Sequence, residues 1–445
     1  MPKPKNIIIV QGAQWGSEAK GMVAANLTLS RQVDYAVRTG AVNAGHTVHW
    51  NGMPQKMQQL PTGWVNPCTT LILGAGTFVH PTILANEIEL VNSLTGEDVR
   101  ERLMIDSRAS LHLEEHTQQA ELENRHHAIG ATGKGCSVAI TDKIRYRGKG
   151  YRLFKDWWQT ELAHGTLPGA LKYVKFTDTV EELHAGYDKG KQILLEGTQG
   201  SHLDLNLGPY PYTTHKPTQA IEWALEAGLA LGMEYEVVMV ARTYPIRVAG
   251  NSGPMAKETT WPNVARTINR KLMRHGMGQR VKSFAIQEFE KVQHELATHT
   301  SWGEMMPKHA DGAPNFDMHT WSQQQRYEHR VALSEFNKAV LQQCGKETLA
   351  ELNNLFEMTT VTKKLRRVAE WNDADVKWAC RVNRGSYIVL TFFNYWFPEL
   401  WDRPINPPTT DEYVEMVRMV EKGAGIPVRY VTTGPETPMM FQVSK

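Results

Sequence analysis

A short β-branched run followed at once by a glycine-rich segment is the feature that most constrains this chain. Ile7-Ile8-Ile9-Val10 leads into Gln11-Gly-Ala-Gln-Trp-Gly-Ser-Glu-Ala-Lys-Gly21. Such an apolar run is typical of a strand buried on both faces of a parallel sheet. Glycines after the strand let backbone N–H groups approach phosphates, and a lysine adds a mobile positive charge. Because Lys20 is followed by Gly21 and Met22, the segment departs from the common G-x-x-x-x-G-K-[ST] loop. A strand-to-helix turn without a binding role therefore stays an alternative interpretation.

Similar apolar runs recur along the chain and alternate with helical patterns. The runs are 71–73, 193–195, 237–240 and 388–390, and the helical patterns are 82–94, 111–125, 218–231 and 334–344. Strands that alternate with helices predict an α/β fold with a mostly parallel central sheet. We expect one catalytic domain over residues 1–445, with an insertion or divergent excursion around 261–321.

Composition narrows the class of function. The net charge of +2 gives no reason to expect bulk binding of nucleic acid or of a membrane surface. The cysteines form no Cys-x-x-Cys pair, which argues against a zinc knuckle or a disulfide scaffold. The first residues lack the pattern of a signal peptide, and no apolar stretch reaches the length of a membrane helix. We therefore expect a cytoplasmic protein.

Three further glycine-rich loops carry polar side chains. They are Thr39-Gly-Ala-Val-Asn-Ala-Gly-His-Thr47, Gly130-Ala-Thr-Gly-Lys-Gly135, and Glu196-Gly-Thr-Gln-Gly200, the last followed by Pro209-Tyr-Pro-Tyr-Thr-Thr214. Open α/β sheets bind their ligands in loops that follow strand ends. A single histidine in a loop is more often structural than functional. Four such loops in one chain, however, predict a ligand site.

Together with 247–254, 360–367 and Thr433-Gly-Pro435, these motifs resemble the adenylosuccinate synthetase family over nearly the whole chain. The resemblance implies a nucleotide-binding fold like that of P-loop proteins, with large helical and loop excursions. It also implies a homodimeric ligase that joins L-aspartate to C6 of a purine nucleotide. A nucleoside triphosphate first phosphorylates the 6-oxo group, and the amine of aspartate then displaces phosphate. Phosphate is a far better leaving group than a lactam oxygen.

The resemblance also implies roles for individual residues. His46 would be the general acid at the 6-oxygen, Lys20 would hold phosphates, and position 17 would take part in catalysis. The donor nucleotide would be bound by Gly16, Ser17, Glu18, Ala19, Lys20, Gly21, Gly45, His46, Thr47, Asn394, Gly434 and Pro435. The monophosphate substrate would be bound by Ser17, Asn43, Ala44, Thr132, Arg147, Gln199, Thr214 and Lys364, with Arg147 reaching into the partner subunit's site. Aspartate would contact Val248, Thr362, Lys364 and Arg366, and Mg²⁺ would be bound at Ser17 and the Gly45 carbonyl.

Three departures from the family pattern bear on the substrates. The family's usual loop reads W-G-D-E-G-K-G, and its aspartate is the general base at purine N1; here Ser17 stands in its place, and a hydroxyl is no comparable base. Serine is smaller and leaves room for a substituent at C2. In the family, a T-K-L-D segment recognises the guanine of GTP through its carboxylate. Here the segment is Thr391-Phe-Phe-Asn394, and the Asn394 amide can donate a hydrogen bond to adenine. Lys364 replaces an arginine and loses its two-pronged donor geometry.

These departures resemble the phage-encoded branch of the family, which converts dGMP to N6-succino-2-amino-2′-deoxyadenylate. We therefore expect dGMP, aspartate, and ATP or dATP as substrates. An ordinary adenylosuccinate synthetase using IMP and GTP stays the alternative, and so does a nucleotide-binding protein that Ser17 has inactivated. Glu18, a metal-bound water or solvent could replace the missing base. His112-Leu-Glu-Glu-His116 also fits the H-x-x-E-H pattern of a zinc hydrolase, a competing enzyme class.

Overall fold

A large, mostly parallel sheet forms the centre of the molecule, as predicted. The computed structural model describes residues 6–123, 129–130, 132–147, 152–315, 320–359, 364–401, 410–436 and 440–443. The strands of the sheet follow the order β16-β15-β14-β10-β1-β9-β2-β5-β6-β8, with β7 beside β5. Their bounds are β1 Ile7–Gly12, β2 Tyr35–Gly40, β5 Thr70–Val79, β6 Leu103–Asp106, β7 Ser110–Leu111, β8 Lys175–Thr177, β9 Ile193–Glu196, β10 Tyr235–Arg242, β14 Tyr387–Thr391, β15 Val428–Thr432 and β16 Met440–Gln442. Among these described strands, β16 alone runs antiparallel to its neighbour.

Strand β1 lies in the middle of this sheet, between β10 and β9. Its side chains alternate between two apolar clusters. Ile7 and Ile9 pack in one cluster with α8 (Ala220–Glu226), α13 (Asp373–Val382) and α15 (Asp411–Ala424), whereas Ile8 and Val10 pack in another with α1 (Lys20–Ser30). Because successive side chains of a strand point to opposite faces, a continuous apolar run is what a strand covered on both faces needs.

A second body, the helical body, consists of helices α9 to α12 packed around a small sheet. That sheet has the order β11-β13-β12, and a separate hairpin joins β3 to β4. The remaining elements are β3 His46–Trp50, β4 Met53–Met57, β11 Ile246–Arg247, β12 Glu258–Thr259, β13 Arg367–Ala369, α2 Pro81–Thr95, α3 Glu114–Leu122, α5 Cys136–Arg145, α6 Phe154–His164, α7 Thr179–Asp188, α9 Trp261–Arg274, α10 Ser283–His299, α11 Gln323–Gln343, α12 Lys346–Leu352, α14 Phe393–Trp396, and the 3₁₀ helices η1 Thr62–Val65, η2 Val99–Arg102, η3 Gly169–Leu171, η4 Ser201–Leu203, η5 Ser301–Glu304 and η6 Pro398–Leu400.

Some predicted helix bounds were wrong. The helix expected over 111–125 begins only at Glu114, because Leu111 pairs with β5 in strand β7. The helix expected over 334–344 is the second half of the longer α11. The stretch around 261–321 is largely helical and contributes Trp261, Ile268 and Phe289 to an apolar cluster. That it is an excursion from a single domain stays a prediction.

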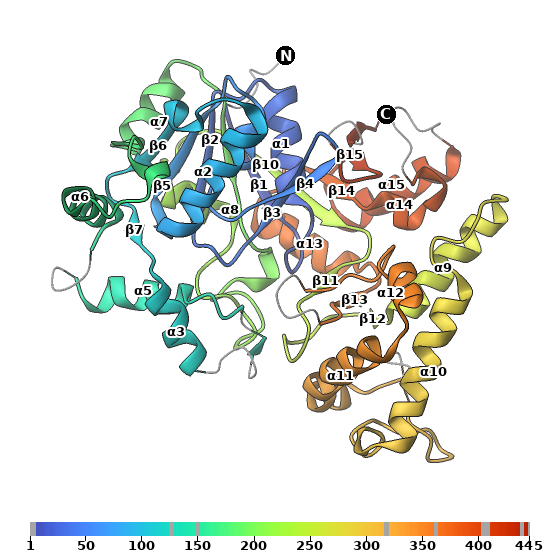
Figure 1. Ribbon diagram of the computed structural model, residues 1–445. Coiled ribbons are helices and arrows are strands. Elements are labelled where there is room, and N and C mark those ends of the chain that lie inside the picture. Colours follow the sequence, from blue (N-terminus) through green and yellow to red (C-terminus); the bar gives the residue numbers. More distant parts are fainter. Residues whose placement is uncertain are drawn as a thin grey trace.

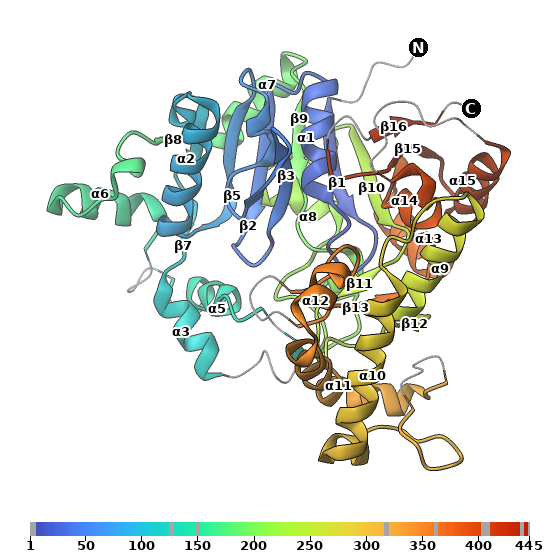
Figure 2. The same cartoon turned by 45° about the vertical axis from the view of Figure 1, so that its right-hand side comes forward.

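The loops after β1, β2, β9, β10, β14 and β15 emerge at one edge of the sheet, because these strands run parallel. In Figure 2, α11, α12 and the small sheet lie below the central sheet. The predicted binding loops thus open toward the second body. Among the described residues, no helix is long and apolar enough to cross a membrane.

Candidate functional site

The segment after β1 forms a tight loop that leads directly into α1. Gly16, Ser17 and Ala19 have φ values of +89°, +60° and +67°, a region in which glycine alone is unstrained. The fully buried Glu18 carboxylate lies inside the loop and accepts hydrogen bonds from the Gly16 N–H at 2.7 Å and from Lys20 Nζ at 2.6 Å. The backbone N–H and the lysine that we expected to face phosphates therefore already hold one anion, the loop's own glutamate.

Ser17 lies exposed on the crest of this loop. Its Oγ is 3.5 Å from Arg366 Nη1, and its carbonyl accepts a hydrogen bond from Arg242 Nη1 at 3.2 Å. Arg242 is ion-paired with Glu357. Burial lowers the pKa of Arg366, and Arg242 acts in the same direction against the opposing effect of Glu357. The loop crest thus lies beside two guanidinium groups, and the residue at position 17 gives them no negative charge.

His46 begins strand β3 and is paired with a carboxylate from another strand end. Its Nδ1 contacts Glu196 Oε1, and both side chains are buried. Glu196 Oε2 accepts hydrogen bonds from Thr62 N at 2.7 Å and Thr62 Oγ1 at 3.0 Å, and Arg38 Nη1 lies 3.4 Å from Oε1. Burial alone would raise the pKa of Glu196, but the charges and donors around it hold that pKa below its usual value. The ionised carboxylate therefore accepts a hydrogen bond from a protonated Nδ1 of His46. The ring nitrogen that Glu196 does not engage is Nε2.

Burial, together with the nearby charge of Arg38, lowers the pKa of His46 to about 4. The imidazole is thus neutral near pH 7 in this state. The sequence places Glu196 in a glycine-rich loop but indicates no role for it, and no motif includes Arg38. A signal existed for Arg38, because a charged residue inside the apolar strand Tyr35–Gly40 must find buried partners.

The loops expected to bind the monophosphate nucleotide pack against the β1 loop and against each other. Gln199 has a φ of +63°, and a Cβ on Gly200 would lie 2.3 Å from the Gln14 carbonyl oxygen, so the two loops touch through backbone. The Thr214 N–H donates to the Leu203 carbonyl at 2.7 Å, and the Thr214 side chain is half-buried. Thr132, at the start of the loop before α5, is exposed, and Arg147, just past the end of α5, is exposed as well.

The segment between β2 and β3 adds further positive charge. The Ala44 carbonyl accepts a hydrogen bond from Arg38 Nη2 at 2.8 Å, and Lys56 of the facing strand lies against Gly45. Asn43 is half-buried, while Gly45 and Thr47 are exposed. Burial lowers the pKa of Lys56, and the charges of Arg366 and Lys134 lower it further. Cations from separate segments of the chain, namely Lys56, Lys134 and Arg366, therefore gather near the start of β3, as expected where a polyanion binds.

The end expected to read the donor base follows β14. The Thr391 hydroxyl donates to the Glu18 carbonyl at 3.0 Å, which ties this segment to the β1 loop. Asn394 is buried in the short helix α14. The Arg242 guanidinium lies 3.9 Å from the ring centroid of Phe392 and thereby covers one face of that ring. Gly434 and Pro435 come directly after β15, the neighbour of β14.

The residues expected to bind aspartate come from the segment just after β11 and from the loop before β13. The Val248 carbonyl accepts a hydrogen bond from Ser252 Oγ at 2.7 Å. The Lys364 ammonium is ion-paired with Glu335 of α11, and Arg366 reaches Ser17 as described above. Thr362 lies outside the described residues.

Comparison with known proteins agrees with this arrangement of loops. A sequence profile described as adenylosuccinate synthetase matches residues 9–167 and 169–301. The chain belongs to the adenylosuccinate synthetase family. The enzyme of Pyrococcus horikoshii is 34% identical over 253 residues, which cover 56% of this chain and 69% of that protein. The enzyme of Methanocaldococcus jannaschii is 26% identical over 431 residues, covering 96% and 94%. This chain is therefore a ligase that forms carbon–nitrogen bonds with aspartate.

Two solved structures share the fold of this family member. The succinoaminodeoxyadenylate synthetase of cyanophage S-2L, bound to dGMP and dATP, aligns with a TM-score of 0.66 at 21% identity and covers 99% of this chain and 96% of that one. The fully ligated adenylosuccinate synthetase of Plasmodium falciparum aligns with a TM-score of 0.65 at 18% identity, covering 99% and 100%. Because the two TM-scores are nearly equal, the fold does not distinguish between these two kinds of synthetase.

In the zinc-hydrolase pattern, the second histidine, His116, is engaged by other groups. His116 Nδ1 accepts a hydrogen bond from the Leu113 N–H at 3.0 Å, and its Nε2 lies 3.4 Å from Asp142 Oδ2. Burial and the neighbouring histidines lower the pKa of His112 to about 3. Within the described parts of the chain, no group of three or more His, Cys, Asp or Glu side chains could hold a metal. His112 precedes α3 and its N–H donates to the Val79 carbonyl at 2.8 Å, so the two histidines do not share a helix as the pattern requires. This arrangement and the ligase family argue against the hydrolase alternative.

Proposed function

We propose that this ligase joins L-aspartate to C6 of dGMP, with ATP or dATP as the phosphoryl donor, to give N6-succino-2-amino-2′-deoxyadenylate, ADP or dADP, and phosphate. One observation carries the proposal. The family's loop aspartate is replaced by Ser17, whose small, neutral side chain stands exposed on the loop crest beside Arg366. A purine with an amino group at C2 needs space next to N1, and a hydroxyl offers both that space and a hydrogen-bond partner.

His46 then acts at the 6-oxygen while Glu196 orients it. The contact with Glu196 keeps a proton on Nδ1 and would stabilise the imidazolium, so that Nε2 can give a proton to the departing oxygen. Burial holds the pKa of His46 at about 4 without substrates. The negative charge of bound phosphates opposes this shift and favours the protonated form. Lys20 leaves Glu18, or shares it, when a phosphate approaches.

The residues present fit a magnesium ion. Ser17 and the Gly45 carbonyl are exposed, neutral oxygen donors, whereas the Glu18 carboxylate is engaged by Lys20 at 2.6 Å. Mg²⁺ takes oxygen ligands and is usually held by a few protein oxygens together with substrate phosphates. When bound, it would supply positive charge to the transferring phosphoryl group.

Donor choice rests on Asn394, which stands where the family has a carboxylate that reads guanine. An amide can donate to adenine N1, which a carboxylate cannot do. We also propose a homodimer in which Arg147 reaches the partner subunit's substrate phosphate, since this arginine is exposed at the end of α5. The pairing of His46 with Glu196 argues against an inactivated protein, because an inactive chain has no need to keep a buried carboxylate bound to this imidazole.

A substrate panel tests the proposal. Aspartate-dependent phosphate release is measured with IMP, dIMP, GMP or dGMP, each with ATP or GTP. We expect the highest kcat/KM with dGMP and ATP. The relatives named as adenylosuccinate synthetases favour the alternative, and a preference for IMP with GTP would establish it. The absence of phosphate release with every pair would support a nucleotide-binding protein instead.

A further inference from the structure

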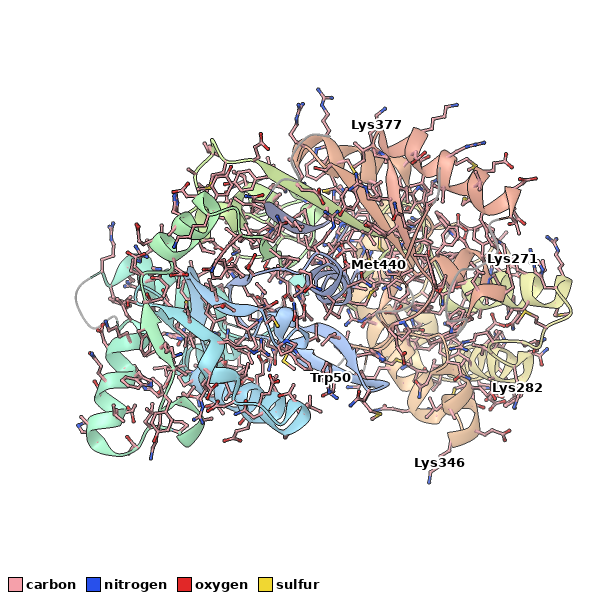
Figure 3. All side chains as sticks on the ribbon, turned by 90° about the horizontal axis from the view of Figure 1, so that it is seen from above. Trp50, Lys271, Lys282, Lys346, Lys377 and Met440 are labelled. Carbon is pink, nitrogen blue, oxygen red and sulfur yellow. The ribbon has the colours of Figure 1, made fainter. Side chains whose placement is uncertain are left out.

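Helix α11 turns a polar stripe toward the interior. Arg330 and Ser334 are four residues apart and therefore share one face of the helix, and they are 6% and 7% exposed. Arg330 Nε and Nη1 and Ser334 Oγ have no hydrogen-bond partner in the structure. Cations elsewhere in the helical body, such as Lys282 and Lys346, point outward (Figure 3). A buried guanidinium with two unsatisfied N–H groups is destabilising unless it serves a ligand.

The surroundings of Arg330 do not neutralise it. Burial, together with the charge of Arg367, lowers the pKa of Arg330 to about 10 against the opposing effect of Glu258. Both oxygens of Glu258, however, are already bound by Arg367, at 2.5 Å from Nε and 2.6 Å from Nη2. One carboxylate thus serves two guanidinium groups, and the cluster keeps an excess of positive charge.

The cluster is connected to the residues expected to bind aspartate. Arg367 Nη1 donates to Ser252 Oγ at 3.0 Å, and Ser252 Oγ donates in turn to the Val248 carbonyl at 2.7 Å. On the other side, α11 binds Lys364 through Glu335. Figures 1 and 2 both show α11 beneath the small sheet β11-β13-β12. The cluster around Arg330 is therefore linked by direct contacts to two segments expected to bind aspartate.

We propose that Arg330 binds a carboxylate of the aspartate substrate. Its planar fork can make two parallel hydrogen bonds to a carboxylate. Lys364 offers a single ammonium group without this fork, and Glu335 already engages it. Helix α11 would thus contribute directly to the substrate site. The inference rests on the aspartate-ligase activity of the family and is independent of the choice between dGMP and IMP.

Arg330→Met in the full-length enzyme tests this role. We expect the KM for aspartate to rise about 10- to 100-fold, with kcat and nucleotide affinity near wild type. We also expect the Tm without substrates to rise by a few degrees, because an unsatisfied buried cation is removed. Arg330→Lys, which keeps the charge but loses the fork, should raise the KM less and leave Tm near wild type. Arg270→Met, an exposed arginine of α9, is the matched control and should change neither value.

Three results would overturn the proposal. The first is an unchanged KM for aspartate in Arg330→Met. The second is a fall in Tm or a failure to fold, which would mean that Arg330 has a structural role. The third is lost nucleotide affinity with an unchanged KM for aspartate, which would assign Arg330 to the substrate phosphate. The aspartate titration uses whichever nucleotide pair the substrate panel identifies, so failure of the dGMP proposal does not affect this result.

Discussion

Replacing Glu196 by glutamine tests the pairing of Glu196 with His46 with almost no change of shape. The carboxylate accepts from His46 and Arg38 on one oxygen and from the Thr62 N–H and hydroxyl on the other. Glutamine has one oxygen and one NH₂ group. If its oxygen faces Thr62, the NH₂ group points donors at His46 and Arg38; if it flips, the NH₂ group meets the Thr62 N–H. Either orientation leaves buried donors opposed and Arg38 without its counter-charge.

The expected losses can be estimated from these contacts. Opposed buried donors and an uncompensated buried charge together cost about 3 kcal/mol in the free energy of unfolding. Because the folded-state pKa of Glu196 is depressed, its stabilisation is present above the pKa of an ordinary glutamate and is lost as pH falls through the folded value. The difference between wild type and variant should therefore shrink in acid. We expect kcat to fall roughly 100- to 10,000-fold, since the imidazolium loses its partner, with smaller changes in KM.

Urea denaturation and steady-state phosphate release measure the two effects, and Glu87→Gln is a matched control. Glu87 is also buried and accepts backbone N–H groups of Gln59 at 3.0 Å and Leu60 at 2.8 Å, close in the chain to Thr62. The control should lose stability but keep kcat within about threefold of wild type. A kcat for Glu196→Gln as high as that of the control would refute the assignment of Glu196 as the positioning residue of His46.

Three further predictions concern other parts of the chain. Ser17→Asp places a carboxylate beside Arg366 and fills the space next to C2; it should raise kcat/KM for IMP relative to dGMP at least about tenfold, and an unchanged ratio would contradict the space argument. Asn394→Asp should shift donor use from ATP toward GTP by about tenfold in kcat/KM, and a ratio equal to that of wild type would remove Asn394 from base recognition. Burial and the neighbouring histidines lower the pKa of His112 to about 3, so the unfolded chain binds this proton at a higher pH than the folded protein, and the free energy of unfolding falls as pH drops below about 6.5. His112→Gln should reduce the loss of unfolding free energy between pH 7 and pH 5 by about 2 kcal/mol, measured by urea denaturation. An identical loss in wild type and variant would mean that another group is responsible.

Much of the architecture could be predicted from the sequence, because it depends on local patterns. A continuous apolar run such as Ile7 to Val10 can be stable as a strand only where both of its faces are covered, and both faces of β1 are. Glycine loops after parallel strands must lie at one edge of the sheet, whatever the details. The motifs identified the family and therefore the ligase chemistry. Helix bounds were less certain, because Leu111 was drawn from a helical pattern into strand pairing.

The pairing of charges was decided only by the tertiary structure. Glu196 and His46 are 150 residues apart, and Ser17 and Arg366 are 349 apart, so no local pattern records that they meet. The sequence showed a lysine at position 20 but not that Glu18 holds it, and it showed an arginine at position 330 but not that its side chain is buried. Local sequence determines which elements form and which chemistry their loops carry. Which charges are neutralised, and which stay free for a substrate, depends on the packing of distant elements, because burial and the nearest counter-charge set the energy of each ionised group.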